Sequence, residues 1–502
     1  MTDMTKGNPF RLLLRFVIPM LLSVALQQMY NLADSLIAGQ MLGMNALAAT
    51  GAAYPITALY VAIATGASIG CSVVISQLFG AKDMVRVRSA VTTSILSIIV
   101  LAFVMVIGGE IFAQPLMNLI GTPENIMGDA MVYLRIYIVG SFFVFLYNAA
   151  TATFNGLGDS KRPLYFLAFS TCFNVALDVL FVGVFHMGVA GLSWATLIAQ
   201  GLSAVLAVLC LIRKVSAIET TETPKVFDKS LCVRMSIVAV PSMCQQSFVS
   251  IGILMVQGVV NSFGADTIAA FSAALKISTF ALNIMNSLPT ALSSYAAQNI
   301  GAEDLPRVRQ GLRACIIMSE VVIISIIGLV VVFSRSLLGL FLTGADGAAA
   351  IEIGRAYLLT VAPLYPLVGI KNCCDSILRG GGAMGPFMAT TFADLGLRVG
   401  FAYATAHSLG FMSICLSYPI GWVLGTTLSV VFYFSSCWKP EHIRRLELGA
   451  ISAEEAAASS RIDLGMLHPI HQVELNRHDQ EEKVDLYRVP RATHNAGRYL
   501  HA

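Results

Sequence analysis

Charged residues are scarce in this 502-residue sequence. They make up 12% of it, about half the share found in ordinary soluble proteins, while 56% of the residues are hydrophobic. A soluble fold of this length needs polar surface over its core, and the sequence has such surface only in short stretches and at its C-terminal end. The composition therefore argues against a soluble enzyme and indicates a chain embedded in lipid. The net charge of +3 is too small to indicate nucleic-acid binding.

Motifs for catalysis and for metal binding are missing as well. The ten cysteines lie in or beside apolar runs without CxxC spacing, so we interpret them as buried free thiols. No GxxxxGK[ST] phosphate loop occurs, which argues against ATP hydrolysis by this chain. Gly66–Gly70 (GASIG) matches a serine-nucleophile pattern, but no strand precedes it, and GxxxG spacing in an apolar helix indicates close helix packing. The sequence predicts neither an enzyme nor a cofactor.

Long apolar runs dominate what is present. A helix needs about 20 apolar residues to cross a bilayer, and backbone amides in hydrocarbon must be bonded within their own segment, so such runs predict helices rather than strands. Twelve runs are separated by glycine, proline or charged residues. They lie near residues 12–38, 46–79, 89–113, 131–154, 163–185, 189–212, 231–262, 268–298, 311–333, 354–378, 386–407 and 410–437. We therefore predict an all-α polytopic membrane protein with twelve transmembrane helices.

Basic residues gather in every second connection between these spans. Positive charge marks cytoplasmic loops, so we expect both termini in the cytoplasm and a multi-pass protein of the cytoplasmic membrane. The basic residues are Lys6, Arg11 and Arg15; Lys82, Arg86 and Arg88; Lys161 and Arg162; Arg213, Lys214, Lys225 and Lys229; and Arg307, Arg309 and Arg313.

The two halves of the chain repeat each other at a shift of about 221 residues. Residues 77–88 read QLFGAKDMVRVR, and residues 298–309 read QNIGAEDLPRVR. An even number of spans in each half makes the halves parallel, and paired repeats of this kind usually hold a substrate between them. We therefore expect two pseudo-symmetric six-helix bundles. The predicted parts are an N-terminal lobe (1–212), a cytoplasmic linker (213–230), a C-terminal lobe (231–437) and a disordered cytoplasmic tail (438–502).

Two carboxylates lie within spans of the first half, where ionisable groups are costly and therefore suggest a function. Counted from the cytoplasmic edge, Asp34 lies roughly 28 Å and Asp178 roughly 22 Å along their helices. Asn174 shares a helix face with Asp178, and Thr196 and Tyr137 reach a similar depth. We predict that these oxygen-bearing groups form a cation-coupling site, which holds either Na⁺ at Asp34, Asn174, Asp178 and Thr196 or a shared proton. In the alternative reading, Asp34 faces headgroup water and Asp178 bonds a neighbouring helix.

The second half differs at the matching places, which hold Val256, beside Gln257, and Phe401. The acidic site is therefore expected in the first half only. Asp394 and Arg398 are four residues apart, the spacing of an ion pair within a helix, which is either structural or directed at a substrate.

Asp375 and Arg379 repeat this spacing near the cytoplasmic end of their span, with Lys371 nearby. This position favours a solvated gate or a loop anchor. Pro19 and Pro241 occupy matching places in the first spans of the two halves. Proline removes a backbone hydrogen bond, so both are candidate hinges.

Four segments resemble the multidrug and toxic compound extrusion (MATE) transporters. They are Gln27–Asp34 (QQMYNLAD), Gly156–Pro163 (GLGDSKRP), Asn174–Asp178 (NVALD) and Gly188–Thr196 (GVAGLSWAT). The similarity covers roughly residues 8–437. It implies two six-helix lobes arranged in a V, and export of drugs or metabolites by H⁺ or Na⁺ antiport. It also implies that Asp34 and Asp178, with Asn174 and Thr196, match the cation site of the first lobe in that family.

We therefore predict a secondary antiporter that exports drugs or metabolites, organic cations above all, driven by H⁺ or Na⁺ entry. Its expected partners are a small-molecule substrate and the lipid bilayer, with no nucleic acid, and it is expected to work as a monomer. The candidate residues of the substrate cavity are Gln27, Gln28, Asn31, Gln257, Asp394 and Arg398. Two alternatives stay open: a flippase or exporter of lipid-linked precursors or anionic metabolites from the same superfamily, and a passive channel or scaffold.

Overall fold

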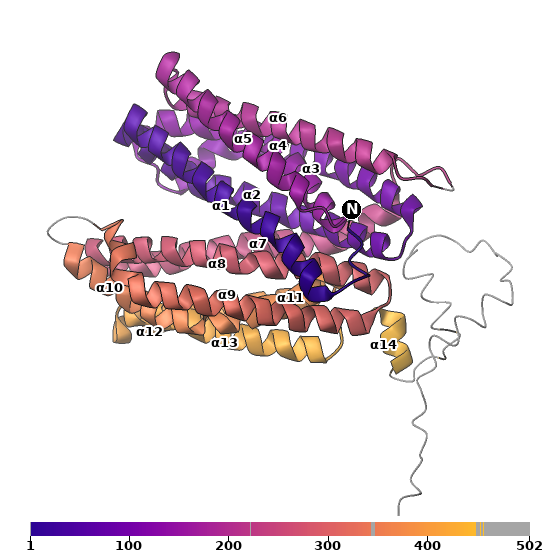
Figure 1. Cartoon of the computed structure of the whole chain (residues 1–502). Coiled ribbons are helices and arrows are strands. Elements are labelled where there is room, and N and C mark those ends of the chain that lie inside the picture. Colours follow the sequence, from indigo (N-terminus) through magenta and orange to yellow (C-terminus); the bar gives the residue numbers. More distant parts are fainter. Residues whose placement is uncertain (1, 221, 343–346, 448–451, 453–454, 456–502) are drawn as a thin grey trace, which may run out of the picture. The chain divides into compact units, whose positions relative to one another are not determined.

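The computed structural model describes residues 2–220, 222–342 and 347–447, together with 452 and 455. These residues form helices and short connections and contain no β-strand (Figure 1). The chain divides into two compact units, Met1–Trp438 and Lys439–Ala502. The first unit contains all the predicted spans.

Six long helices make up the first lobe of this unit. They are α1 (Pro9–Ile37) with its π-helical extension η1 (Ala38–Leu42), α2 (Met44–Gly80), α3 (Met84–Leu119), α4 (Glu124–Gly156), α5 (Lys161–Asp178) with its π-helical extension η2 (Val179–Val184), and α6 (Gly188–Ser216). Asn8 caps the start of α1, where its side chain accepts hydrogen bonds from the Phe10 and Arg11 amides.

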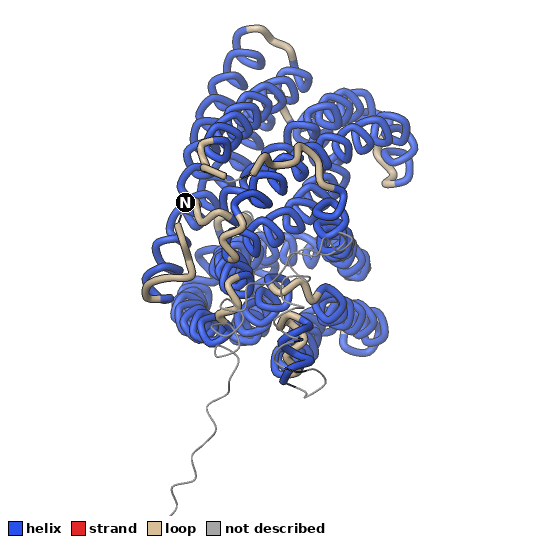
Figure 2. The backbone as a smooth tube through the Cα atoms, turned by 90° about the vertical axis from the view of Figure 1, so that its right-hand side faces the viewer, coloured by secondary structure: helices blue, strands red, loops and turns tan. Residues whose placement is uncertain are grey.

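The second lobe repeats this arrangement. Its helices are α7 (Lys229–Val260) with η3 (Asn261–Phe263), α8 (Ala265–Gly301), α9 (Leu305–Gly339), α10 (Gly347–Val361), η4 (Ala362–Leu364), α11 (Tyr365–Gly380), α12 (Met384–Leu409) and α13 (Met412–Phe434). The two lobes lie one above the other in Figure 1, and Figure 2 views the same bundle roughly along the helix axes.

These helices account for the twelve predicted spans within the described residues. Eleven helical stretches are long and apolar enough to cross a membrane, and the remaining one, α12, carries Asp394 and Arg398. The tenth span is broken at η4, because Pro363 and Pro366 cannot donate helical hydrogen bonds there. The fold is therefore that of a polytopic α-helical membrane protein.

Glycines allow α2 to pack closely against α7 of the other lobe. A Cβ atom on Gly66 would lie 2.5 Å from the Met243 backbone, and one on Gly70 would lie 2.6 Å from the Ala239 Cβ. No side chain fits at such distances. The prediction that Gly66–Gly70 serves helix packing is confirmed.

The C-terminal ends of α2 and α8 also meet. A Cβ on Gly80 would overlap the Gln298 carbonyl oxygen, and a Cβ on Gly301 would overlap the Gln77 carbonyl oxygen. The repeated segments identified in the sequence thus contact each other across the two lobes. We call this contact, Gln77–Gly80 against Gln298–Gly301, the closed end.

The connection between the lobes lies against α3. Arg88 donates a hydrogen bond to the Ile218 carbonyl (3.2 Å), Ser89 Oγ accepts one from the Lys225 amide (2.9 Å), and Thr93 Oγ1 accepts one from the Asp228 amide (3.0 Å). These bonds hold the linker in place, although its described residues between α6 and α7 form no helix or strand.

All ten cysteines are free thiols in the structure. Burial holds for only part of the set. Cys71, Cys315, Cys373, Cys374 and Cys415 are buried, whereas Cys172 is exposed.

The second unit begins with a short helix, α14 (Glu441–Glu447). Within this unit, Lys439 forms an ion pair with Glu447 (2.5 Å). The predicted disordered tail falls mainly on residues that lie outside the described ranges.

Candidate functional site

The carboxyl groups of Asp34 and Asp178 lie within hydrogen-bonding reach of each other. Asp34 lies one turn before the end of α1, and Asp178 is the last residue of α5. Asp178 is fully buried, and Asp34 is partly buried. Two carboxylates this close repel each other unless a proton or a cation lies between them.

A π-helical turn follows each carboxylate, directly after Asp178 and one helical turn after Asp34. The turns η1 and η2 follow α1 and α5, and they pack together with α6 in a cluster of Ala38, Val182 and Leu192. π-Helical turns widen the backbone and are frequent at functional sites. Helices α1 and α5 pack against each other, and the contact between η1 and η2 continues this packing beyond their ends.

Thr196 and Asn174 complete the polar cluster. Thr196 Oγ1 accepts hydrogen bonds from Tyr30 Oη (3.2 Å) and from Asn174 Nδ2 (3.4 Å). Among the described residues, no donor reaches Asn174 Oδ1, Asp34 Oδ1 or either carboxylate oxygen of Asp178, although all four atoms are buried. Buried acceptors normally have partners, so these four oxygens are suited to a bound cation or proton.

Tyrosines surround this cluster, but the predicted Tyr137 is not among those nearest to the carboxylates. The charges of Asp34 and Asp178 act on the phenols of Tyr30 and Tyr133. Tyr137 lies one turn further along α4 and stacks on Tyr133, with ring centroids 6.3 Å apart. Sequence reasoning missed Tyr30 and Tyr133, although Tyr30 lies within the same segment as Asp34.

A cavity of about 510 Å³ lies between the two lobes. Helices α2 and α4 line it from the first lobe, and α7, α8 and α11–α13 line it from the second. A second cavity of about 410 Å³ lies between α1, α4, α5 and α8. Both cavities share Thr151, Asn155, Asn286 and Thr290 in their walls.

The predicted cavity residues divide between several places. Gln27 and Gln28 line the smaller cavity and are linked to Asn31 by hydrogen bonds of 3.4 and 3.3 Å. Asp394 and Arg398 line the larger cavity. Gln257 lines neither of them and donates instead to Asn261 (2.9 Å) near the end of α7.

Asp394 and Arg398 form the intrahelical ion pair that their spacing predicts, with 2.7 Å between Oδ1 and Nη2. Both side chains are buried, and the Arg398 guanidinium lies 4.5 Å from the centroid of the Tyr418 ring. Gly421 of α13 makes room for the pair, because a Cβ there would overlap Asp394 Oδ1.

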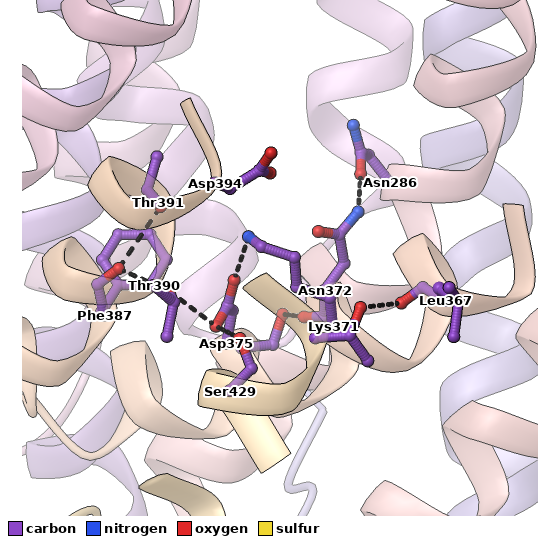
Figure 3. A network of polar contacts seen from close by, with 12 residues as sticks. Asn286, Leu367, Lys371, Asn372, Asp375, Phe387, Thr390, Thr391, Asp394 and Ser429 are labelled. Atoms are coloured by element: carbon purple, nitrogen blue, oxygen red, sulfur yellow. Dashed lines mark hydrogen bonds and ion pairs between the residues drawn. The ribbon is translucent and has the colours of Figure 1, made fainter. Parts of the chain in front are cut away.

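Asp375 corrects an expectation, because it is not a solvated anchor. It is buried and pairs with Lys371 at 2.8 Å, and its other oxygen accepts hydrogen bonds from Thr390 (3.2 Å) and Ser429 (2.6 Å) (Figure 3). Arg379, the other neighbour of Asp375 at helical spacing, donates to Ser293 Oγ instead (3.2 Å). The three helices α11–α13 therefore join in one polar network inside the second lobe.

Glu320 of α9 is a further ionisable residue within a span, and sequence reasoning overlooked it. Its Oε1 atom is buried without a hydrogen-bond partner among the described residues. It faces Gly369 of α11, where an added Cβ would lie 2.9 Å from it. The sequence signal that could have identified Glu320 was a single carboxylate within an apolar span.

Two glutamines from the sequence repeat bond across the closed end. Gln77 Nε2 of the first lobe donates to the Gly380 carbonyl of the second (2.8 Å). Gln298 Nε2 of the second lobe donates to the Gly156 carbonyl of the first (2.8 Å). The contact between the lobes is therefore reciprocal, as the internal repeat implies.

The segment before α1 also touches both lobes at the closed end. Asp3 pairs with Lys82 of the first lobe (2.7 Å). The Met4 amide donates to Gln298 Oε1 (2.9 Å), and Arg307 donates to the Met4 carbonyl (3.2 Å) in the second lobe. This segment thus bridges the lobes beside the two glutamines.

The two candidate hinge prolines lie inside unbroken helices. Pro19 belongs to α1 and Pro241 to α7, the first helices of the two lobes. Ser23 Oγ donates to the Pro19 carbonyl (2.9 Å), a bond within the helix that can favour bending.

The MatE family model matches residues 19–180 and 241–404, more than half of the chain. "Probable multidrug resistance protein YoeA" of Bacillus subtilis is 30% identical over 452 residues, which are 88% of this chain and 97% of that protein. "FAD transporter" of Shewanella oneidensis is 24% identical over 60% of this chain and 68% of that protein.

The fold also matches solved structures. One of them, described as an outward-facing conformation of a multidrug resistance MATE family transporter of the MOP superfamily, has a TM-score of 0.81 at 21% identity. The match covers 87% of this chain and 97% of that chain.

Proposed function

Because this chain belongs to the MATE family of transporters, we propose that it is a secondary antiporter that exports drugs or metabolites in exchange for H⁺ or Na⁺. The Asp34–Asp178 pair is the coupling site. The observation that carries this proposal is the set of four buried oxygens without donors at Asp34, Asn174 and Asp178. They are acceptors only, as a cation requires.

Either ion suits this chemistry. A proton would join the two carboxyl groups by a hydrogen bond, and Na⁺ would use the hard oxygens of Asp34, Asn174, Asp178 and Thr196. One elementary charge that moves through 100 mV supplies about 2.3 kcal/mol, which is enough to drive modest accumulation of a solute.

Binding at this pair couples to the cavity through α1 in our proposal. Asp34 shares α1 with Gln27 and Gln28, which line the smaller cavity, and with Pro19. A cation that draws the ends of α1 and α5 together would change the shape of this helix above the proline. The cation and the solute would then favour different conformations of α1, so that binding of one would weaken binding of the other.

The basic loops support an orientation with both termini in the cytoplasm. In this orientation, the closed end faces the cytoplasm and transport requires the bonds of Gln77 and Gln298 to break and reform. Rocking of one lobe against the other around a central site is the usual mechanism for paired repeats. A single chain contains both lobes, so the proposed working unit is a monomer in the cytoplasmic membrane.

Solute efflux from proteoliposomes tests the proposal. Wild type and Asp34→Asn are compared under separately imposed pH and Na⁺ gradients with a fluorescent dye, and Glu352→Gln, an exposed carboxylate paired with Arg335, is the control. We expect one gradient to drive efflux by wild type and by the control, but not by Asp34→Asn. Efflux by Asp34→Asn at the wild-type rate under that gradient would reject the coupling site.

A second candidate function, export of anionic solutes, is favoured by the charges in the larger cavity. Its carboxylates, Asp375 and Asp394, are already paired with Lys371 and Arg398, which weakens the expectation of simple organic cations. A relative named as a transporter of FAD, a dinucleotide with a diphosphate, agrees with such a substrate. The passive-channel alternative predicts that no gradient moves solute uphill, which the same experiment examines.

A further inference from the structure

The charged residues that line the 510 Å³ cavity all come from the second lobe. Three are basic and two are acidic, which gives the wall a net charge of 3 − 2 = +1. They are Lys371, Arg379, Arg398, Asp375 and Asp394. The first lobe contributes only uncharged side chains to this wall, among them serines, threonines and asparagines.

Both carboxylates of the wall are already paired with a basic residue of their own helix. Asp394 holds Arg398 at 2.7 Å. Asp375 holds Lys371 at 2.8 Å and also accepts hydrogen bonds from two hydroxyl groups. A cationic solute at either carboxylate would lie beside a lysine or an arginine of the same helix, whose positive charge repels it.

Arg379 is the remaining basic residue. Its Nε atom donates to Ser293 Oγ (3.2 Å). The charge of Asp375 acts on it, although no carboxylate among the described residues lies within ion-pair distance of it. A guanidinium group has five N–H donors in a planar fork that suits carboxylate and phosphate oxygens. A positive charge in a partly buried wall is costly unless an anion or water compensates for it.

Neutral polar groups and an aromatic wall accompany Arg379 in the same cavity. Asn372 donates to Asn286 Oδ1 (2.7 Å), and both residues line the cavity (Figure 3). Tyr418 and Trp422 line it as well, next to Arg398. The cavity thus combines one arginine that has no direct ion pair among the described residues with hydrogen-bonding amides and flat apolar rings.

We propose that Arg379 binds an anionic group of the transported solute, a carboxylate or a phosphate, and that the substrates are therefore organic anions or zwitterions. This inference rests on the proposed transport function and specifies its substrate class. Ser293 positions the guanidinium by accepting its Nε–H, which leaves the fork of Nη atoms for the anion.

A matched pair of dyes tests this proposal by direct binding. The probes are a rhodamine with a free carboxylate and the same rhodamine as its methyl ester, which lacks the negative charge. Their affinities are measured by fluorescence polarisation on purified full-length protein in phosphatidylcholine nanodiscs, with empty nanodiscs subtracted. The variants are Arg379→Gln and Arg379→Lys, and the matched control is Arg335→Gln, which removes an exposed arginine outside the cavity.

We expect wild type and the control to bind the carboxylate dye at least about 10-fold more tightly than the ester, because a hydrogen bond to a charged group contributes more free energy than a tenfold change in affinity requires. Arg379→Gln should bind both dyes equally, and Arg379→Lys should keep part of the preference. Equal binding of both dyes by wild type, or an unchanged preference in Arg379→Gln, would overturn the proposal.

Two further arms keep the outcome decisive. If Arg379→Gln does not fold, high salt must weaken wild-type binding of the carboxylate dye and spare the ester, and a lack of this difference would overturn the proposal. The second arm adds phosphatidylglycerol to the nanodisc, which shows whether the bound anion comes from a lipid or from a soluble solute. If this lipid competes with the carboxylate dye, Arg379 binds a lipid headgroup; if it does not compete, Arg379 binds a soluble solute.

The binding test is independent of ion coupling. Loss of the carboxylate preference together with intact gradient-driven efflux would overturn only the anion subsite. An intact preference without gradient-driven efflux would overturn only the antiport.

Discussion

Gln298→Ala is expected to loosen the closed end in both lobes at once. The Gln298 side chain is fully buried, and it donates to the Gly156 carbonyl and accepts from the Met4 amide at 2.8 and 2.9 Å. Alanine removes both bonds. The Gly156 carbonyl keeps one partner, Ser76 Oγ at 3.2 Å, whereas the buried Met4 amide loses its acceptor.

One buried donor left without a partner costs about 1–3 kcal/mol. If this cost falls on the arrangement with a closed end, the ratio of closed to opened molecules drops by roughly 5- to 150-fold. Only states in which the glutamine is bonded are affected, so a state with separated lobes gains population by this factor.

Hydrogen–deuterium exchange followed by mass spectrometry measures this ratio without any label. The informative peptides cover residues 76–82 at the end of α2 and 297–303 at the end of α8. Both should exchange faster in Gln298→Ala by about the factor given above. The control is Gln114→Ala, which removes an exposed glutamine bonded to Asn118 within α3.

Unchanged exchange in both peptides would refute the reasoning. Faster exchange confined to 297–303 would refute it too, since it would mean that α8 frays by itself and that the bond does not hold the first lobe.

Three other outcomes are expected. Gly70→Val should lower the melting temperature in detergent, at a cost of about 1–3 kcal/mol, because its Cβ would meet α7, while Gly108→Val, with open space around its Cβ, should not. Lys371→Met should destabilise the protein by about 3–5 kcal/mol in denaturation assays, because it leaves the buried carboxylate of Asp375 without its ion pair. A double variant that also replaces Asp375 should regain stability. Burial alone would raise the pKa of Asp159, but Lys214 and Arg162 lower it below the ordinary value. The ion pair of Asp159 with Lys214 should therefore stabilise the fold above about pH 4 and lose its effect as the pH falls further. In thermal unfolding measured against pH, Lys214→Met should differ from wild type only above about pH 4.

Much of the architecture could be predicted from the sequence, because membrane spans leave a strong hydropathy signal and the repeat is explicit. The repeated segments beginning at Gln77 and Gln298 predicted paired lobes. Their reciprocal bonds could not be predicted, because sequence similarity between halves does not say which surfaces of the halves meet.

Side-chain partners were harder to predict. Asp375 has Lys371 four residues before it and Arg379 four residues after it, and spacing alone favours the acid-first pair with Arg379. The structure has the opposite pair, because Ser293 of α8 holds Arg379 and hydroxyl groups of α12 and α13 hold Asp375. Such choices depend on helices that are distant in the sequence.

The cluster at Asp34 and Asp178 was proposed from independent depth counts, and the structure brings Asn174 and Thr196 to it as well. Tyr137 was predicted to lie at the carboxylates, but their charges act on Tyr133, one helical turn before it. A difference of one turn exceeds the resolution of counting residues. Nothing in the sequence indicated the π-helical turns.

The most direct test of cation coupling is displacement of the cation by the solute in purified protein. Protons released into a weakly buffered solution, and bound radioactive sodium, are measured while the carboxylate dye is added to wild type, Asp34→Asn and Asp178→Asn. We predict that wild type releases one of the two cations as the dye binds, and that both variants bind the dye without any release. Dye binding that leaves both cations in place in wild type, or release that persists in both variants, would contradict the account.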